Sequence, residues 1–213
     1  MSRHNDPTVL SFHESLLRQS DVALLQGPFW LNDHIISFYL EYLDMVVFED
    51  NTDLLFISPE VTQCLKIVSE NEITVFLEPL DAVNKSFIFF PLNDNDQDKV
   101  GGSHWSLLVY SKPEQAFYHF DSMSPSNEVH CEKFIRKIKN YLNVDAVVLR
   151  AAHCLAQTNG YDCGVHVLCN AENIAHHVVS KGSVDGVSKV TNDSVKRMRA
   201  DIIDIINKLQ TEK

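Results

Sequence analysis

A cysteine lies where a polar loop meets an apolar helical pattern, a setting that activates a thiol. Residues 157–164 read QTNGYDCG, and a mostly apolar helical pattern follows over residues 163–178. A thiol at this junction faces the positive end of the helix dipole, which favours the thiolate form. Gln157 carries an amide that could donate, together with the backbone N–H of Cys163, to a developing oxyanion. We therefore predict Cys163 as a nucleophile, with Gly164 leaving room for a substrate backbone.

A histidine and an aspartate flank a predicted β-hairpin. Short aromatic and β-branched runs at 105–110 and 116–120 surround a turn at 112–114, with His104 before the first run and Asp121 after the second. Antiparallel pairing about that turn places His104 opposite Asp121, within reach of a hydrogen bond. A carboxylate that holds one imidazole nitrogen fixes the tautomer and leaves the other nitrogen free as a base. Such pairs are common in any fold, so the chemistry depends on Cys163 and Gln157 joining this pair.

The other cysteines lack the setting of Cys163. The five cysteines are Cys64, Cys131, Cys154, Cys163 and Cys169, an odd number with no C-x-x-C motif. This usage indicates free thiols in a reducing compartment. Cys154 is a second, less favoured nucleophile, and a zinc site built from Cys163, Cys169, His176 and His177 can be drawn, although its spacing fits no usual pattern. A thiol hydrolase using His104, Asp121, Cys163 and Gln157 is the favoured interpretation.

The elements that position these residues are helices around a sheet. Helices are predicted after Asn32 or Asp33 as the capping residue, after Ser58-Pro59, over 127–142 and 163–178, and along an apolar stripe from Val195 to Leu209. That stripe favours packing on the protein's own core over a coiled coil. Strands are predicted at 86–92, 105–110, 116–120 and 146–149. The pattern predicts an α+β fold, a central and largely antiparallel sheet flanked by helices.

Length and composition describe a single ordered domain. The chain has 213 residues, of which 45% are hydrophobic and 22% charged, and no break in composition marks a linker. We expect one domain over 1–213, with residues 1–8 and 180–189 flexible. No apolar run is long enough to span a membrane, and no signal peptide is visible at the start. The formal net charge of -11 disfavours nucleic acid as a partner and suits a basic partner or peptide tail.

The motifs together resemble those of a known family. The segments GGSHWSLLVY, YHFDS and QTNGYDCG, in this order after WLND, resemble the Ulp/sentrin-specific cysteine proteases, which have a papain-like fold. The resemblance runs from about residue 10 to residue 209. The segments SLLRQSDVALL, WLNDHII, FISPEVTQ and FLEPLD resemble the deneddylase branch in particular, whose members remove a Nedd-type ubiquitin-like modifier.

The resemblance implies roles for individual residues. It implies a triad of His104, Asp121 and Cys163 with Gln157 in the oxyanion hole, and it requires no metal or organic cofactor. It also implies that Trp30 and Trp105, which the residues alone would place in the core, roof a tunnel that only a Gly-Gly tail can thread. Asp33 would contact basic residues of that tail near the tunnel entrance. The polar segment 93–102 would be either a flap that closes on the substrate or an ordinary exposed loop.

The expected function is cleavage after the C-terminal Gly-Gly of a Nedd-type modifier, both in precursor maturation and in removal from cullins and other conjugates. The expected partners are that modifier and its conjugates, without nucleic acid or membrane, for a monomer in the cytoplasm or nucleus. Three alternatives remain open: a deSUMOylating protease, an acyltransferase that uses the same triad, and a module that binds a ubiquitin-like protein without cutting it.

Overall fold

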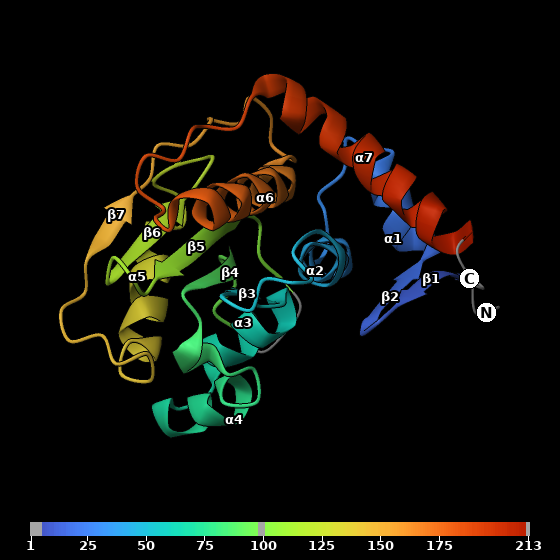
Figure 1. The fold of residues 1–213 in the computed structure, drawn as a ribbon. Coiled ribbons are helices and arrows are strands. Elements are labelled where there is room, and N and C mark those ends of the chain that lie inside the picture. Colours follow the sequence, from blue (N-terminus) through green and yellow to red (C-terminus); the bar gives the residue numbers. More distant parts are fainter. Residues whose placement is uncertain (1–5, 98–100, 212–213) are drawn as a thin grey trace.

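A five-stranded mixed sheet forms the centre of the computed structural model, which describes residues 6–97 and 101–211. Its strand order is β3-β4-β5-β6-β7. The strands are β3 (Leu54–Phe56), β4 (Phe87–Asn93), β5 (Trp105–Ser111), β6 (Ala116–Phe120) and β7 (Leu149–Ala151). The pairs β4–β5 and β5–β6 are antiparallel, whereas β3 and β7 join the two edges in parallel (Figure 1). The predicted α+β fold is confirmed, with a sheet that is antiparallel at its centre and parallel at both edges.

The last strand begins three residues later than the predicted strand at 146–149. Val147 and Val148 are 41% and 42% exposed, so their apolar side chains do not pack against a partner strand. Val148 contributes only its carbonyl, which accepts from the backbone N–H of Phe117. Strand pairing with β6 starts at Leu149, which pairs with Phe117.

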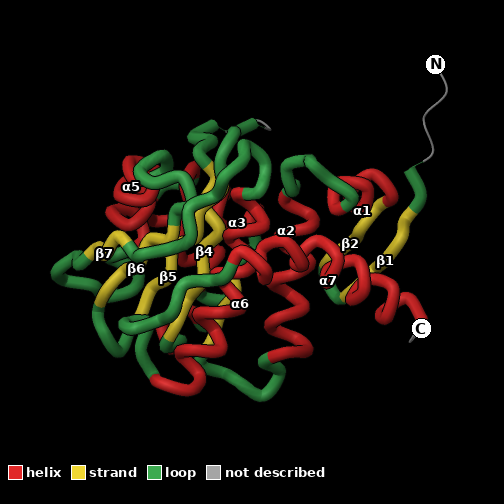
Figure 2. The backbone as a smooth tube through the Cα atoms, turned by 90° about the horizontal axis from the view of Figure 1, so that it is seen from above, coloured by secondary structure: helices red, strands yellow, loops and turns green. Residues whose placement is uncertain are grey.

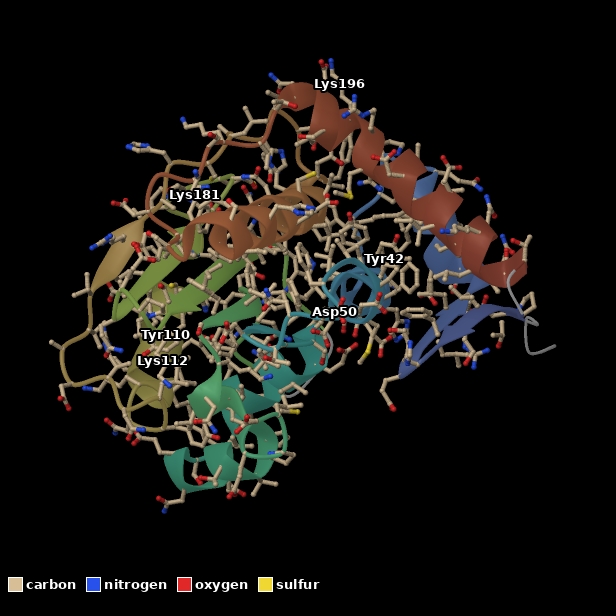
Figure 3. All side chains as sticks on the ribbon, viewed as in Figure 1. Tyr42, Asp50, Tyr110, Lys112, Lys181 and Lys196 are labelled. Atoms are coloured by element: carbon tan, nitrogen blue, oxygen red, sulfur yellow. The ribbon has the colours of Figure 1, made fainter. Side chains whose placement is uncertain are left out.

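Alternation along the central strands divides the core between the two faces of the sheet. Phe89 and Val109 face one helical layer, which includes α6 (Cys163–Lys181) and α2 (Asp33–Tyr42). Phe90 and Leu108 face the other layer, built from α3 (Pro59–Ile67), α4 (Ile73–Leu77) and α5 (Glu128–Ile138). Both faces of the sheet are therefore covered (Figure 1), and side chains fill the space between the layers (Figure 3). Shorter turns complete the chain: a π-helical turn at Leu43–Val47 and 3₁₀ turns at Glu70–Glu72 and Ala82–Asn84.

The two ends of the chain pack together beside the main sheet. A hairpin of β1 (Thr8–Phe12) and β2 (Ser15–Arg18), followed by α1 (Gln19–Leu25), lies against the last helix, α7 (Asn192–Thr211) (Figure 2). Gln210 Nε2 donates to the carbonyl of Val9 over 2.7 Å. The buried residues of α7 are Met198, Ile202 and Ile206, so its apolar stripe packs on the core and makes no coiled coil. No helix in the described ranges is both long and apolar enough to cross a membrane.

Two stretches that we expected to be flexible make defined contacts. Residues 1–5 of the stretch 1–8 lie outside the described residues, but the carbonyl of Pro7 accepts from the N–H of Gln19 and Thr8 begins β1. In the stretch 180–189, α6 continues to Lys181, and the carboxylate of Glu114 then accepts from the Ser183 hydroxyl and the backbone N–H of Val184. Val184 is buried. The prediction for 180–189 is wrong because a carboxylate distant in sequence holds that loop.

Local chemistry accounts for the helix starts that position the site. The Asn32 side chain accepts from the N–H of Ile35 at the start of α2, which decides between Asn32 and Asp33 as the cap. Ser58 caps α3 in the same way, with Pro59 as its first residue. A Cβ on Gly164 would come within 3.0 Å of Leu31 Cβ, so this glycine makes room for the segment before α2. Its predicted role in leaving room for a substrate backbone stays a prediction.

Candidate functional site

His104 and Asp121 form a buried hydrogen-bonded pair. His104 Nε2 lies 2.6 Å from Asp121 Oδ1, and both side chains are almost fully buried. Burial raises the pKa of Asp121, but hydrogen bonds from His104 and from the N–H groups of Asn127 and Met123 lower it by a larger amount. The pKa is therefore below its ordinary value, and the carboxylate stays ionised. Because an ionised carboxylate only accepts, the imidazole proton on this side lies on Nε2. The contact predicted from the hairpin is present.

The predicted register of that hairpin was one residue off on each strand. Leu107 pairs with Phe120 and Ser111 with Ala116, so the loop between the strands has four residues and Asp121 follows opposite Ser106. The fourth loop residue, Gln115, adopts a left-handed conformation at φ 47°. His104 and Asp121 are thus diagonal neighbours. A shift of one residue on both strands keeps the two side chains on the same face, which explains why the contact survives.

Asn127 fixes the far side of the aspartate. Its backbone N–H donates to Asp121 Oδ2 over 2.9 Å, and its side-chain amide donates to the carbonyl of Leu92 and to Ser106 Oγ. Asn127 is completely buried. The carboxylate is therefore held by strands β4 and β5 as well as by the loop that follows β6. Sequence reasoning missed this residue, because its partners lie on strands that precede it in the chain.

The Cys163 thiol interacts with the His104 side chain. Cys163 is the first residue of α6, as the loop–helix junction predicted, and its side chain is buried. His104 Nδ1 is buried and has no hydrogen bond of normal geometry within the described part of the chain. Burial lowers the pKa of His104, but the hydrogen bond to Asp121 and the interaction with the Cys163 thiol raise it to about 9. The geometry therefore favours a charged imidazolium beside the sulfur at neutral pH.

Gln157 is held at both ends of its side-chain amide. Ser122 Oγ donates to Gln157 Oε1 over 2.7 Å, and Gln157 Nε2 donates to the carbonyl of Asn159 over 2.6 Å. The backbone N–H of Gln157 also donates to the carbonyl of Ser122. Gln157 is thus tied to the residue that follows Asp121 and to the loop that leads into Cys163. Among the contacts of residues 6–97 and 101–211, this amide donates one N–H, so the other N–H is available as a donor.

A network from the C-terminal helix braces the loop before Cys163. Arg199 on α7 donates to Asp162 Oδ1 over 2.8 Å and to the carbonyl of Phe29 over 2.7 Å. Asn159 Nδ2 donates to the other oxygen of Asp162, and Asp162 itself precedes the first turn of α6. The motif N-G-Y-D-C contained the signals for Asn159 and Asp162, which are turn and cap residues. No local signal identified Arg199, 37 positions beyond its partner.

The tryptophans and Asp33 line one cavity with Cys163. This cavity of about 180 Å³ is bordered by Trp30, Leu31, Asn32, Asp33, Asn93, Gly101, Gly102, Ser103, Trp105 and Cys163. Trp30 is 50% exposed, so its placement in the core, expected from the residues alone, is wrong. Its indole N–H donates to the carbonyl of Gly160, and that of Trp105 donates to the carbonyl of Leu31. Both rings are fixed by these bonds beside the nucleophile. Asp33 is exposed at the first position of α2.

The segment 93–102 is anchored where it is described. Asp94 Oδ1 accepts from the N–H groups of Ser103 and His104, and Gln63 donates to the carbonyls of Asn95 and Gln97. Gly102 has φ 93°, and a Cβ there would lie 1.8 Å from Asn93 Oδ1, so only glycine fits. Residues 98–100 lie outside the described residues, and the closing flap stays a prediction.

Three other cysteines have raised pKa values, which disfavours their thiolate forms. Burial raises the pKa of Cys131 and Cys169, with Cys169 at about 12. Burial followed by the nearby Asp121 charge raises the pKa of Cys154, whose thiol donates to the Asp121 carbonyl. Within residues 6–97 and 101–211, no three His, Cys, Asp or Glu side chains are placed to hold a metal ion. The zinc arrangement with Cys169, His176 and His177 is therefore not formed.

Comparison with known proteins agrees with this geometry. Residues 29–210 match the model of the Ulp1 protease family, C-terminal catalytic domain. The chain is 43% identical to sentrin-specific protease 8 of Rattus norvegicus over 208 residues, which cover 96% of each chain. It is 33% identical to NEDD8-specific protease 1 of Arabidopsis thaliana over 219 residues, covering 98% of this chain and 96% of that protein.

The solved structures show the same fold. The C-terminal Ulp1 protease domain in complex with SMT3, the yeast ortholog of SUMO, superposes with a TM-score of 0.77 at 19% identity, covering 98% of this chain and 90% of that one. At this identity the likeness speaks for the fold alone. The family match across residues 29–210 and the full-length identity to sentrin-specific protease 8 show that this chain belongs to the Ulp1 family of cysteine proteases.

Proposed function

We propose that this protein cleaves after the C-terminal diglycine of a NEDD8-type ubiquitin-like modifier, both to mature its precursor and to release it from cullins and other conjugates in the cytoplasm or nucleus. The observation that carries the choice of modifier is the similarity, along nearly the whole chain, to a relative named NEDD8-specific protease 1. The hydrogen bond between His104 and Asp121, together with the interaction of the Cys163 thiol with His104, supports the chemistry.

The proposed reaction passes through a thioester. The Cys163 sulfur attacks the carbonyl carbon of the last glycine, and the carbonyl oxygen takes the negative charge of the tetrahedral intermediate. The backbone N–H of Cys163 and the free N–H of Gln157 donate to that oxygen. His104 gives its Nδ1 proton to the leaving amine as the C–N bond breaks, and Asp121 holds the imidazole in place. Water, activated by His104, then attacks the thioester and regenerates the thiolate.

Gln157→Ala should lower kcat by roughly 10²-fold with little change in KM, because removal of one oxyanion donor has an effect of this size. The Gln157 amide donates to the substrate oxygen only when that oxygen becomes negatively charged, so ground-state binding of the modifier should stay the same. Steady-state kinetics on a modifier with a C-terminal fluorophore measure both constants. Unchanged kcat in a folded variant would remove Gln157 from the oxyanion hole.

A modifier whose last glycine is replaced by alanine should be cut roughly 5- to 160-fold more slowly than the native diglycine, since an added methyl in a tightly packed slot costs about 1–3 kcal/mol. Trp30 and Trp105 are each fixed by an indole hydrogen bond beside Cys163, so neither ring can easily withdraw from a side chain in the cavity. A modifier with alanine four positions further from the scissile bond is the matched control. Equal cleavage of both variants would contradict a tunnel selective for glycine.

The protein should cleave a NEDD8 precursor at least about tenfold better than SUMO or ubiquitin precursors. The net charge of -11, together with Asp33 exposed at the cavity, suits a basic modifier tail. Tenfold selectivity needs only about 1.4 kcal/mol of differential transition-state binding, and the electrostatic part should weaken as salt is added. Side-by-side kcat/KM values on the three modifiers, each with the same fluorophore, provide the measurement. A preference for SUMO would replace the modifier in this proposal and leave the triad chemistry in place.

A further inference from the structure

We infer that Ser122 is a positioning residue that orients the Gln157 amide toward the oxyanion. The inference rests on the proposed function, since it concerns the same site. Ser122 does not line the cavity beside Cys163, and it follows Asp121 directly in the chain. Its hydroxyl is buried and donates to Gln157 Oε1 over 2.7 Å.

The hydrogen bonds around Gln157 fix which way its amide points. The carbonyl of Asn159 can only accept, so the group facing it must be the Nε2 of Gln157. The amide oxygen then faces Ser122, whose hydroxyl must be the donor. The Asn159 carbonyl therefore selects one of the two flipped orientations, and the Ser122 hydroxyl stabilises it by donating to the amide oxygen. This orientation leaves a single Nε2 hydrogen free.

Both partners of the amide are themselves rigidly held. Asn159 Oδ1 accepts from the N–H groups of Tyr161 and Asp162, each over 3.0 Å, which fixes the carbonyl that Gln157 meets. On the other side, the Ser122 carbonyl accepts from the Gln157 N–H over 3.0 Å, so backbone and side chain of Ser122 both grip the same residue. Removal of the hydroxyl leaves the amide oxygen without its buried donor and frees the side chain to rotate.

The loss should appear in the chemical step. Loss of one hydrogen bond should reduce the fraction of molecules with the productive Gln157 orientation by up to about tenfold. Ser122→Ala should therefore lower kcat about 3- to 10-fold and leave KM unchanged. In a Gln157→Ala background the same substitution should cost nothing further, because the group it orients is absent. Ser126→Ala is the matched control: its exposed hydroxyl bonds to the Met123 carbonyl in the same loop, and its kcat should equal that of the wild type.

A second pair of measurements separates the oxyanion from the triad. Alkylation of Cys163 by iodoacetamide forms no oxyanion, so Ser122→Ala should leave its rate and pH profile unchanged. Binding of a NEDD8 C-terminal aldehyde, which adds the thiol to give a tetrahedral adduct, should weaken by the same factor as kcat. If Ser122→Ala does not fold, Ser122→Gly removes the same hydroxyl and is read in the same way.

The inference would be overturned if Ser122→Ala lowered kcat by the same factor in the wild-type and Gln157→Ala backgrounds. It would also be overturned if Ser122→Ala slowed the alkylation of Cys163, because the substitution would then act through Asp121. An unchanged kcat in Ser122→Ala would overturn it as well. Wild-type turnover of the NEDD8 substrate is measured in the same series and tests the proposed function by itself. If another modifier is the one cleaved, the Ser122 ratios are measured on that modifier.

Discussion

Replacing Cys163 with serine should lower turnover of the NEDD8 substrate by at least about 10³-fold, the scale seen when one member of a catalytic unit is removed. A serine hydroxyl at the start of α6 stays protonated beside the His104 imidazolium, so no nucleophile forms. A modifier that carries a C-terminal electrophile should label the wild-type protein once, at Cys163. Peptide mapping locates the adduct, and kcat of the variant gives the loss.

Cys64→Ser is the matched control, because Cys64 is exposed on α3 and distant in sequence from the site motifs. It should retain wild-type kcat and still be labelled. Cys154 is the informative competitor, since its thiol contacts the Asp121 carbonyl. An adduct at Cys154 with Cys163 unmodified would contradict the assignment of the nucleophile.

Replacing Asp121 with asparagine should lower kcat by about 10⁴-fold, because no orientation of the amide satisfies its surroundings. Oδ1 accepts from His104 and from the Met123 N–H, and Oδ2 accepts from the Asn127 N–H. An amide NH2 on the Asn127 side would face another donor. On the His104 side it would favour the tautomer with the proton on Nδ1, which cannot take the thiol proton. A wrong tautomer has a cost of this order in a triad.

The pH profile distinguishes this cause from general destabilisation. Burial lowers the pKa of His104, but Asp121 and the Cys163 thiol together raise it to about 9, above its ordinary value, so the imidazolium persists up to that pH and is lost above it. Without the carboxylate charge, only the interaction with Cys163 still opposes burial, so the pKa of His104 falls. In the plot of the Cys163 alkylation rate against pH, the change on the alkaline side should therefore move toward neutral pH in Asp121→Asn. The exposed Asp145→Asn serves as the control and should keep the wild-type profile; an unmoved profile in Asp121→Asn would refute the role of Asp121.

Elements set by neighbouring residues were predictable. The caps at Asn32 and Ser58 depend on hydrogen bonds that span three residues, and the strand at 116–120 was predicted with its observed bounds. The predicted contact between His104 and Asp121 is present although the predicted register of the hairpin is wrong. Alternation decides on which face of the sheet each side chain lies, whereas the turn decides only how far the two strands are offset along each other. Alternation and capping are readable along the chain, since both arise within a few residues.

Elements that depend on distant partners were not predictable. The parallel strand β3 was not predicted, and the strand predicted at 146–149 begins only at Leu149, because β4 and β6 offer the free edges on which β3 and β7 form. The loop after α6 is ordered by Glu114, about 70 positions earlier. The N-terminal hairpin owes its place to α7, at the opposite end of the sequence. In each case the stabilising group lies beyond the reach of any local pattern.

The same division holds at the site. By itself, the sequence determined the fold class, the candidate nucleophile at a loop–helix junction, and the His104–Asp121 pair, because each follows from periodicity, helix polarity or hairpin alternation within one segment. Only the tertiary structure decided that Trp30 is exposed beside Cys163, that Gly164 accommodates Leu31, that Ser122 and Asn159 orient Gln157, and that Arg199 braces Asp162. These contacts join segments up to 170 residues apart, as between Arg199 and Phe29. Contacts over such distances in sequence depend on how the helices and the sheet pack together, and no single segment contains the information that specifies them.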